Sequence, residues 1–271
     1  MAGVLLRRRY TKGMTLMGND SRVNYIDNID CLEWLKDVPD SSVDLIVTDP
    51  PYLFSQASSV GKKIDPWADW CNAAFWYATW FQEARRILKA SGAMWTFLNW
   101  KSMVTFQKAA CIANWPIESL LVWDKEWIGP GGVKGLRPSY ELCALFCMPD
   151  FAIPNRGLPD IQRFKWSSKK PHGHPAEKPE ALVRWIIEQS TSNGAVVADM
   201  FMGSGTTAEA CIRSGRKFIG CEMNPEWHAI ALQRIEETKN ELCGRVYNMD
   251  RADTQKPDPT LFDLMMEEAA Q

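Results

Sequence analysis

Residues 195–207 read Ala-Val-Val-Ala-Asp-Met-Phe-Met-Gly-Ser-Gly-Thr-Thr, and the chain continues with the helix-forming run Ala-Glu-Ala-Cys. This order predicts an apolar strand over 195–198, then a glycine turn and a helix. Such a turn brings backbone close to a nucleotide-like ligand. Gly203 and Gly205 lack the Cβ atoms that would obstruct this approach. The stretch therefore predicts an α/β fold with a ligand at the carboxyl end of the strand.

The next predicted strand, 217–221, ends at Glu222, whose carboxylate can accept hydrogen bonds from ribose hydroxyls. The run 203–208 also fits the dinucleotide-binding pattern, with Glu222 near the expected distance. A nicotinamide dehydrogenase is therefore an alternative for this segment alone. A phosphate-binding P-loop is excluded because no lysine follows the second glycine. A dehydrogenase of this fold would usually begin with this unit, whereas here it lies late in the chain.

A second motif lies at 43–52, where an apolar strand ends in Asp49-Pro50-Pro51-Tyr52. An ionised Asp49 and the Pro50 carbonyl are both acceptors, so each can take one proton of an exocyclic amine on a planar base. The two prolines stiffen the turn, and Tyr52 can stack on a base that has been extruded from a duplex. The alternative is an ordinary strand-to-loop turn, since prolines often end strands.

Taken together, the two motifs resemble those of the amino-methylating, S-adenosylmethionine-dependent DNA methyltransferases. Asp-Pro-Pro-Tyr precedes the glycine motif here, which resembles the permuted order of the β class, and the likeness is greatest to N6-adenine enzymes. Residues 28–44 and 174–179 resemble the family's segments before the catalytic and cofactor strands. The resemblance implies one catalytic domain over 1–248, with a doubly wound, mostly parallel sheet of seven strands. This is the class I methyltransferase fold.

The resemblance also implies a reaction, in which a methyl group passes directly from S-adenosylmethionine to the N6 amine of a flipped adenine in double-stranded DNA. The catalytic residues would be Asp49, Pro50, Pro51 and Tyr52. The cofactor would be bound by Asp30, Cys31, His174, Lys178, Asp199, Phe201, Gly203, Ser204, Gly205, Thr206, Thr207, Glu222 and Met223. No metal is expected.

Three of these cofactor roles have structural alternatives. Lys178 would pair with the methionine carboxylate, with His174 beside it, but a locally bonded turn histidine is an equal interpretation of His174. Asp30 would bind the cofactor's adenine amine or cap a helix. Asp199 would contact the amino-acid part of the cofactor or hold the loop.

Two alternatives to adenine methylation also remain. N4-cytosine methylation is the first, although such enzymes more often carry Ser or Thr where Asp49 stands. The second is an inactive relative that binds cofactor or DNA without turnover.

Target recognition is expected within 149–173, which is short for such a region. Nine basic residues are candidates for phosphate contact: Arg156, Arg163, Lys165, Lys169 and Lys170 in this region, and Lys62, Lys63, Lys134 and Arg137 on two further loops. The alternative is a merely solvated face. The formal net charge of the whole chain is -2, so attraction to DNA must come from local patches.

Composition and periodicity complete the expectations. A chain of 271 residues, 46% hydrophobic and 24% charged, predicts one large α/β domain. Helices are predicted over 31–37, 69–90, 101–113 and 180–190, and the earlier strands over 23–27, 43–48, 93–98, 117–123 and 140–147. Gly92 is expected to end the second helix. The strands over 117–123 and 140–147 are expected to pair antiparallel at a sheet edge, and residues 249–271 are expected to form a mobile acidic tail. No segment is apolar enough for a membrane span. The family implies a cytoplasmic protein of bacterial or phage origin, and it allows a homodimer.

Overall fold

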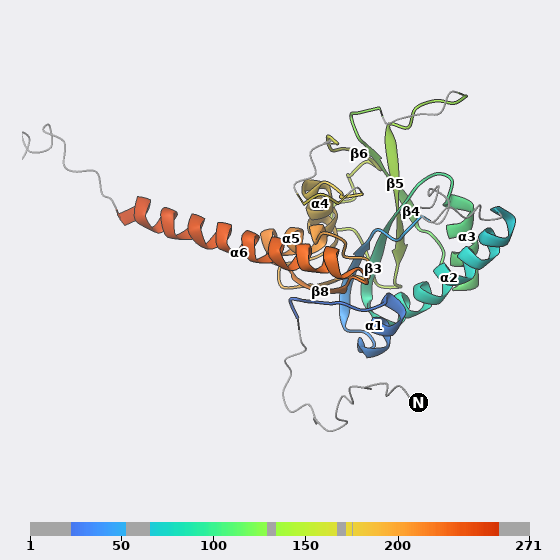
Figure 1. Cartoon of the computed structure of the whole chain (residues 1–271), viewed down its shortest axis with the longest axis horizontal. Helices are drawn as coiled ribbons and strands as arrows, with labels where there is room; N and C mark the ends of the chain where they lie inside the picture. Colours follow the sequence, from blue (N-terminus) through green and yellow to red (C-terminus); the bar gives the residue numbers. More distant parts are fainter. Residues whose placement is uncertain (1–22, 53–65, 129–133, 167–171, 175, 255–271) are drawn as a thin grey trace, which may run out of the picture.

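The structure is a computed structural model that describes residues 23–52, 66–128, 134–166, 172–174 and 176–254. The strands are β1 (Tyr25–Asp27), β2 (Val43–Thr48), β3 (Leu88–Leu98), β4 (Ser119–Asp124), β5 (Tyr140–Cys147), β6 (Ile161–Arg163), β7 (Val196–Asp199) and β8 (Lys217–Cys221). The helices are α1 (Cys31–Asp37), α2 (Pro66–Ile87), α3 (Met103–Ile112), α4 (Glu180–Ser190), α5 (Thr206–Arg213) and α6 (Pro225–Thr254). The strands form one sheet in the order β1-β8-β7-β2-β3-β5-β4-β6, and its pairs are mostly parallel (Figure 1).

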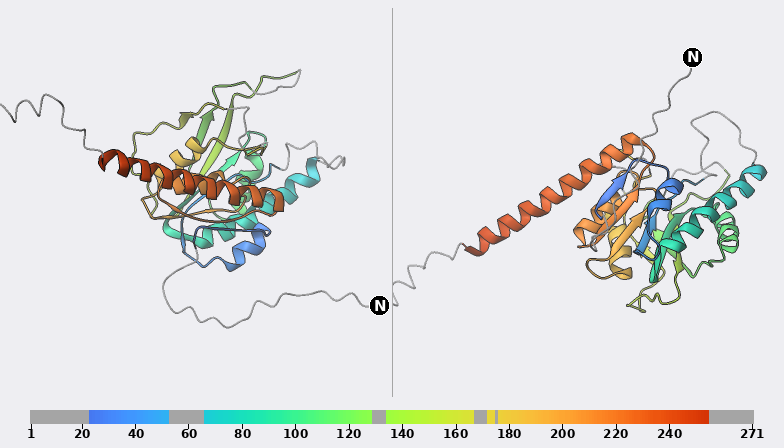
Figure 2. Two further views of the ribbon diagram at one scale, coloured as in Figure 1. Left: turned by 60° about the vertical axis from the view of Figure 1, so that its left-hand side comes forward. Right: turned by 90° about the horizontal axis from the view of Figure 1, so that it is seen from below.

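Helices cover both faces of this sheet, as Figures 1 and 2 show. On one face, Ile46 of β2 packs in a core with Tyr77 and Phe81 of α2. On the other face, the adjacent Leu45 packs in a second core with residues such as Leu182 of α4. Successive side chains of a strand point to opposite faces, so a strand buried on both sides must be apolar throughout. This explains the apolar run 45–47 in β2, and the two cores confirm the doubly wound α/β fold.

The centre of the sheet brings the two sequence motifs together. β2 and β7 are parallel neighbours, with Leu45 opposite Val197 and Ile46 opposite Ala198. Their carboxyl ends are joined by a hydrogen bond of 2.7 Å from the Thr48 hydroxyl to the Asp199 carboxylate. The Asp-Pro-Pro-Tyr turn and the glycine turn therefore leave the sheet side by side, where ligands bind in folds of this kind.

The sheet has eight strands within the described residues rather than the predicted seven. The additional strand, β6, lies within residues 149–173, where no strand was predicted. It is only three residues long and pairs in parallel with β4. A strand this short has no periodicity of its own, because its hydrogen bonds to β4 form only in the folded chain. The antiparallel pairing of β4 with β5 is confirmed, but β6 occupies the outer edge.

Two predicted boundaries were wrong. α2 ends at Ile87, and Gly92 lies inside β3 instead of ending the helix. A Cβ at Gly92 would stand 3.0 Å from the Asp44 carbonyl oxygen, so the glycine allows β3 to approach β2 closely. The tail expected from 249 also begins later, because α6 continues to Thr254 and extends well past the sheet (Figure 2). Residues 255–271 lie outside the described part of the chain.

None of the helices in the described part of the chain is both long and apolar enough to cross a membrane.

Candidate active site

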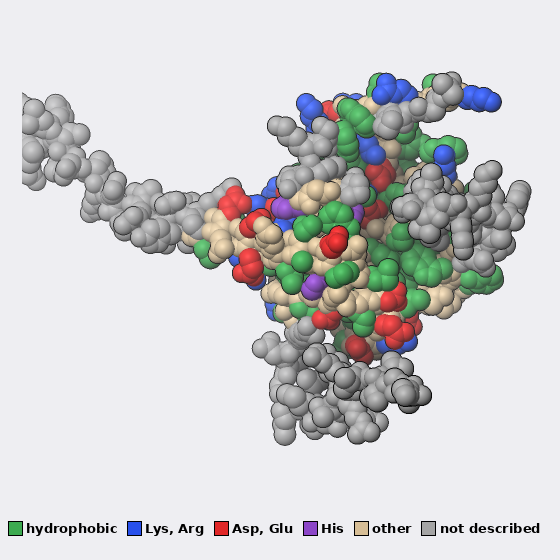
Figure 3. Space-filling view, viewed as in Figure 1, with side chains coloured by type: hydrophobic (Ala, Val, Ile, Leu, Met, Phe, Trp, Pro, Cys, Tyr) green, Lys and Arg blue, Asp and Glu red, His purple; other side chains and the backbone are tan. Residues whose placement is uncertain are grey.

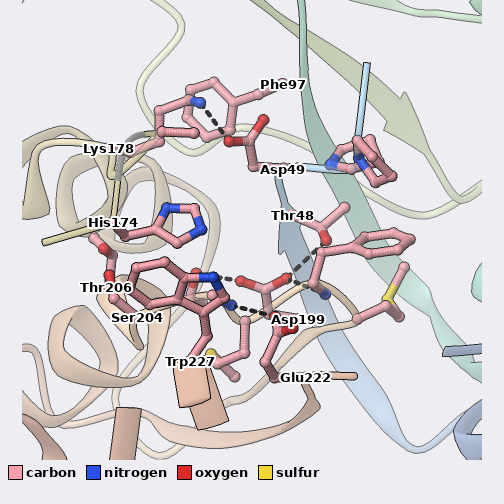
Figure 4. Close-up of a pocket in the computed structure, with 18 of the residues that line it drawn as sticks. Thr48, Asp49, Phe97, His174, Lys178, Asp199, Ser204, Thr206, Glu222 and Trp227 are labelled. Carbon is pink, nitrogen blue, oxygen red and sulfur yellow. Dashed lines mark hydrogen bonds and ion pairs between the residues drawn. The ribbon is translucent and has the colours of Figure 1, made fainter. Parts of the chain in front are cut away.

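A cavity of about 510 Å³ opens at the carboxyl ends of β2 and β7. It is lined by the Asp-Pro-Pro-Tyr turn and by most of the residues predicted to bind the cofactor, namely Asp30, Cys31, His174, Lys178, Asp199, Phe201, Gly203, Ser204, Thr206, Thr207, Glu222 and Met223. Gly205 is the predicted residue that does not line it. Figure 4 shows several of these side chains around the cavity, among them Asp49, Lys178, Asp199 and Glu222.

Asp199 holds the start of the glycine turn. One carboxylate oxygen accepts hydrogen bonds from the Thr48 hydroxyl (2.7 Å) and the Phe201 backbone N–H (2.9 Å), and the other accepts one from the Thr207 hydroxyl (2.6 Å). Burial raises the pKa of Asp199 to about 6, although these donors oppose the shift. The loop-holding interpretation of Asp199 is thus confirmed, while contact with the cofactor stays a prediction.

The two glycines of the turn have different reasons to be glycine. Both have positive φ, 54° at Gly203 and 87° at Gly205, which side chains rarely tolerate. A Cβ at Gly203 would face the His174 ring at 3.6 Å, on the cavity side. A Cβ at Gly205 would instead meet the Cα of Ala231 in α6 at 3.1 Å. Gly205 therefore lets α6 pack against the turn, and the expectation that its missing Cβ makes room for the ligand was wrong.

The opposite wall of the cavity comes from β8 and its surroundings. Glu222 accepts hydrogen bonds from the Gly203 N–H and the Asn224 N–H, both at 2.8 Å, which fixes its carboxylate beside the turn. Asp30 caps α1 by accepting a bond of 2.9 Å from the Leu32 N–H, so its capping interpretation is confirmed while it also lines the cavity.

An aromatic residue that sequence reasoning missed completes this wall. Trp227, at the start of α6, lines the cavity and packs edge-on against His174 with ring centroids 4.5 Å apart. Burial lowers the pKa of His174, so its ring is neutral near pH 7. Trp227 therefore adds an aromatic ring to the cavity lining.

A buried arginine ties the glycine turn to the segment that carries Lys178. Arg234 of α6 is only 4% exposed. Its guanidinium donates to the Thr206 hydroxyl (3.0 Å) and pairs with Glu209 (2.6 Å) and Glu177 (3.1 Å). Because Glu177 directly precedes Lys178, the turn and that segment share one support.

The Asp-Pro-Pro-Tyr turn is fixed by its own residues and by α2. The Tyr52 hydroxyl lies 2.7 Å from Asp49 Oδ1, and the Tyr77 hydroxyl donates to the Pro51 carbonyl at 2.7 Å. Asp49 is thereby oriented into the cavity (Figure 4). Burial raises the pKa of Asp49, and the nearby ammonium of Lys178 opposes this shift. Stacking of Tyr52 on a base stays a prediction.

Lys178 lies between two carboxylates. Its ammonium contacts Asp49 Oδ2 and lies 3.2 Å from Glu141 Oε1, and it is 9% exposed. Glu141 also accepts from the Tyr52 hydroxyl at 2.7 Å and pairs with Lys125 at 2.9 Å. Burial would raise the pKa of Glu141, but the two lysines prevail and hold it at about 2, so Glu141 stays charged. The pKa of Lys178 is raised despite its burial, since both carboxylates favour the ammonium.

Sequence reasoning missed Glu141, although the sequence carries a signal for it. Glu141 is the one charged residue in the apolar run 140–147, which forms β5. A carboxylate in a strand buried on both faces needs a buried partner. That partner is Lys178, which lies 37 residues further along the chain (178 minus 141). The proposed pairing of Lys178 with the methionine carboxylate stays untested.

The predicted DNA-contacting residues in the described part of the chain do not line this cavity. Those in the described part are exposed, namely Lys134, Arg137, Arg156, Arg163 and Lys165. Figure 3 shows Lys and Arg side chains gathered at the end of the molecule where β4, β5 and β6 project. Lys62, Lys63, Lys169 and Lys170 lie outside the described residues. Beside this basic edge, Trp127 and Trp166 stack with ring centroids 4.1 Å apart.

Comparison with known proteins identifies the family. The model of a DNA methylase family, the N6 and N4 amino-methyltransferases, matches residues 43–233. The YubD protein of Escherichia coli (strain K12) is 32% identical over 223 residues, covering 82% of this chain and 94% of its own. A DNA adenine methyltransferase of the same organism, YhdJ, is 29% identical and covers 82% and 85%.

Solved structures agree on the fold. The M1.HpyAVI complex with S-adenosylmethionine has a TM-score of 0.62 at 23% identity, covering 78% of this chain and 98% of that one. The cytosine-N4-specific PvuII DNA methyltransferase also has a TM-score of 0.62, at 19% identity and with coverage of 80% and 89%.

The cavity fits the methyl donor of this family, S-adenosylmethionine. Its volume is in the range of small-molecule sites, and the carboxylates of Asp49, Asp199 and Glu222 suit a ligand with a positive sulfonium. Gly203 keeps the turn open towards it. The chain belongs to the family of S-adenosylmethionine-dependent DNA amino-methyltransferases.

Proposed function

We propose that this protein transfers a methyl group from S-adenosylmethionine to the N6 amine of adenine in double-stranded DNA, as a member of the β class. The observation that carries the proposal is the position of Asp49, a carboxylate held by Tyr52 and aimed into the cavity beside the glycine turn. An aspartate here favours adenine, because the cytosine enzymes more often carry Ser or Thr. The name of YhdJ, an adenine methyltransferase, also supports this choice.

For this reaction the protein has to position the two reactants and stabilise the charge that develops between them. When bound, the cofactor supplies a methyl group on a sulfonium, which is already an activated electrophile. The target amine is a poor nucleophile because its lone pair is delocalised into the ring. Asp49 and the Pro50 carbonyl accept hydrogen bonds from the two N–H groups of the amine, and they stabilise the positive charge that develops on its nitrogen during attack. Burial makes this stabilisation stronger than in water, and no cysteine nucleophile is required.

The DNA would lie across the basic edge described above. Lys134, Arg137, Arg156, Arg163 and Lys165 are exposed there and can contact phosphates. The stacked pair of Trp127 and Trp166 adds an apolar surface at the same edge. We therefore assign target recognition to residues 149–173 together with the loop at 125–137, within one catalytic domain over 1–248.

One experiment tests the assignment. The full chain is incubated with S-adenosylmethionine carrying a labelled methyl group and with unmodified DNA, and the DNA is then digested to nucleosides. We expect the label in N6-methyladenine. Label in N4-methylcytosine would replace the adenine assignment with the cytosine alternative. If neither product forms while cofactor and DNA both bind, the chain is an inactive relative.

A further inference from the structure

The structure assigns Lys178 a role in reading the target base: we propose that its ammonium donates a hydrogen bond to the ring nitrogen next to the target amine. The inference rests on the proposed function and deepens it. It makes the pair of Asp49 and Lys178 a two-point reader, with an acceptor for the amine and a donor for its neighbour. Glu141 is the positioning residue that holds this donor in place.

The first support is the geometry of the pair. Asp49 and Lys178 are in direct contact, and both line the cavity (Figure 4). An acceptor and a donor thus stand side by side. Adenine presents the matching arrangement, because its amine donates and the adjacent ring nitrogen N1 accepts. Enzymes that flip a base read this edge by hydrogen bonds.

The second support is the hydrogen-bonding capacity of Lys178. An ammonium carries three donors and no acceptor. Among the described residues, Asp49 and Glu141 account for two of its interactions, so a third N–H remains for a ligand. The ammonium also lies 5.1 Å from the Phe97 ring centroid, and Phe97 lines the same cavity. The raised pKa of Lys178 keeps this donor charged at neutral pH.

The third support is selectivity. Guanine and thymine present a carbonyl oxygen and a ring N–H at this edge, the reverse of adenine. Their carbonyl would face the Asp49 carboxylate, and their ring N–H would face the ammonium, so both contacts would be repulsive. Cytosine has the same order as adenine, with its ring nitrogen N3 beside the amine. The pair therefore separates amino bases from oxo bases, while size separates adenine from cytosine.

Glu141 explains why the donor stays in this position. A lysine paired with Asp49 alone would be free to follow that carboxylate and cover both of its oxygens. Glu141 Oε1, at 3.2 Å, gives the ammonium a second fixed partner, and Lys125 and Tyr52 hold Glu141 in turn.

The test uses base analogues in a single methylatable DNA site. In 1-deazaadenine, a C–H replaces the proposed acceptor, whereas 3-deazaadenine lacks the ring nitrogen on the other side and serves as control. We expect the wild-type protein to lose about ten- to hundredfold in kcat/KM with 1-deazaadenine, as for a hydrogen bond from a charged donor, and to accept 3-deazaadenine. Equal rates with adenine and 1-deazaadenine would overturn the proposal without any variant being made.

A double-mutant cycle then assigns the contact to Lys178. We expect Lys178→Met to lower kcat/KM for adenine. In this variant adenine and 1-deazaadenine should react with similar kcat/KM, because the donor that distinguishes them is gone. Glu141→Gln should reduce the discrimination in part. Lys89→Met is the matched control, because Lys89 pairs with Asp44 and neither residue lines the cavity, so its loss should leave the ratio of the rates for the two bases unchanged.

Two other outcomes are decisive. If the Lys178→Met loss is the same with adenine and 1-deazaadenine, Lys178 acts only through Asp49 and the proposed contact is absent. If the protein instead methylates cytosine, the adenine assignment fails while the two-point reader is tested in the same way with 3-deazacytosine. Thermal unfolding of each variant establishes that the folded protein is being measured.

Discussion

Gly205→Ala should destabilise the fold more than Gly203→Ala and leave the cofactor site open, whereas Gly203→Ala should obstruct that site. At Gly205 the added Cβ meets two costs. The left-handed φ of 87° costs about 1–2 kcal/mol for a residue with a side chain. The contact at 3.1 Å with the Cα of Ala231 adds an overpacking cost of about 1–3 kcal/mol, because helix backbone cannot rotate away.

Gly194→Ala is the matched control for this experiment. Gly194 has a similar φ of 79°, and its Cβ would meet nothing within 4 Å. The difference between the two variants therefore isolates the packing against α6, which we expect to be about 2 kcal/mol. Urea unfolding followed by circular dichroism measures it, with an unchanged m-value as the sign that one transition is compared. Equal losses for Gly194→Ala and Gly205→Ala would show that α6 moves aside at no cost.

Calorimetry on the folded variants gives the second half of the prediction. A Cβ at Gly203 faces the cavity and should weaken S-adenosylmethionine binding. One at Gly205 faces away from it and should not. Reversed affinities would mean that the turn presents its other side to the cofactor.

Three further predictions follow from the site and its surroundings. Asp49→Ala should abolish methyl transfer through kcat while cofactor affinity is kept, since Asp49 acts on the amine; near-normal turnover in single-turnover assays would contradict the mechanism. Asp199 has a pKa of about 6 in the fold against 3.8 unfolded, so folding favours its neutral form, and the stability that it contributes is lost as pH rises from about 4 to 6. Relative to Asp199→Asn, the free energy of unfolding of the wild type should fall by about 2 kcal/mol between pH 4.5 and 7.5. A difference between the two proteins that stays constant with pH in urea unfolding would refute this. Neutralising Arg163, Lys165, Lys169 and Lys170 should reduce the slope of log K against log salt for duplex DNA by about 0.9 per lost phosphate contact, whereas an unchanged slope would place the DNA on the loops at 53–66 and 125–137.

The sequence predicted the centre of the fold better than its edge. β2 and β7 carry short apolar runs, 45–47 and 196–198, that end in special turns, so local pattern alone located both strands and the cavity between them. β6 was missed because three residues acquire strand conformation only by pairing with β4. Gly92 was misassigned because a glycine that ends a helix and a glycine that permits close strand approach look alike in sequence.

The candidate site shows the same difference between local features and features that depend on distant partners. Residues within the motifs could be named from the sequence, because their chemistry and spacing are local. Trp227 and Arg234 could not, since their importance comes from partners far away in the chain. Glu141 had a local signal, a single charge in an apolar strand, but its distant partner Lys178 could not be read from the sequence. Gly205 was assigned to the right turn but to the wrong neighbour, because the direction of a missing Cβ depends on where α6 packs.

The shared support at Arg234 limits what a mutational survey of this protein can report. Its guanidinium holds the glycine turn through Thr206 and the Lys178 segment through Glu177. Removing it breaks the buried ion pairs with Glu177 and Glu209, at a cost of about 3–5 kcal/mol, although Glu209 keeps its pair with Arg213. A screen that scores only methylated DNA would rank Arg234 with Asp49, although the arginine touches neither substrate. Separate measurements of folding, cofactor affinity and turnover would instead show that Arg234 supports the fold. Its loss would disturb the glycine turn and the Lys178 segment together.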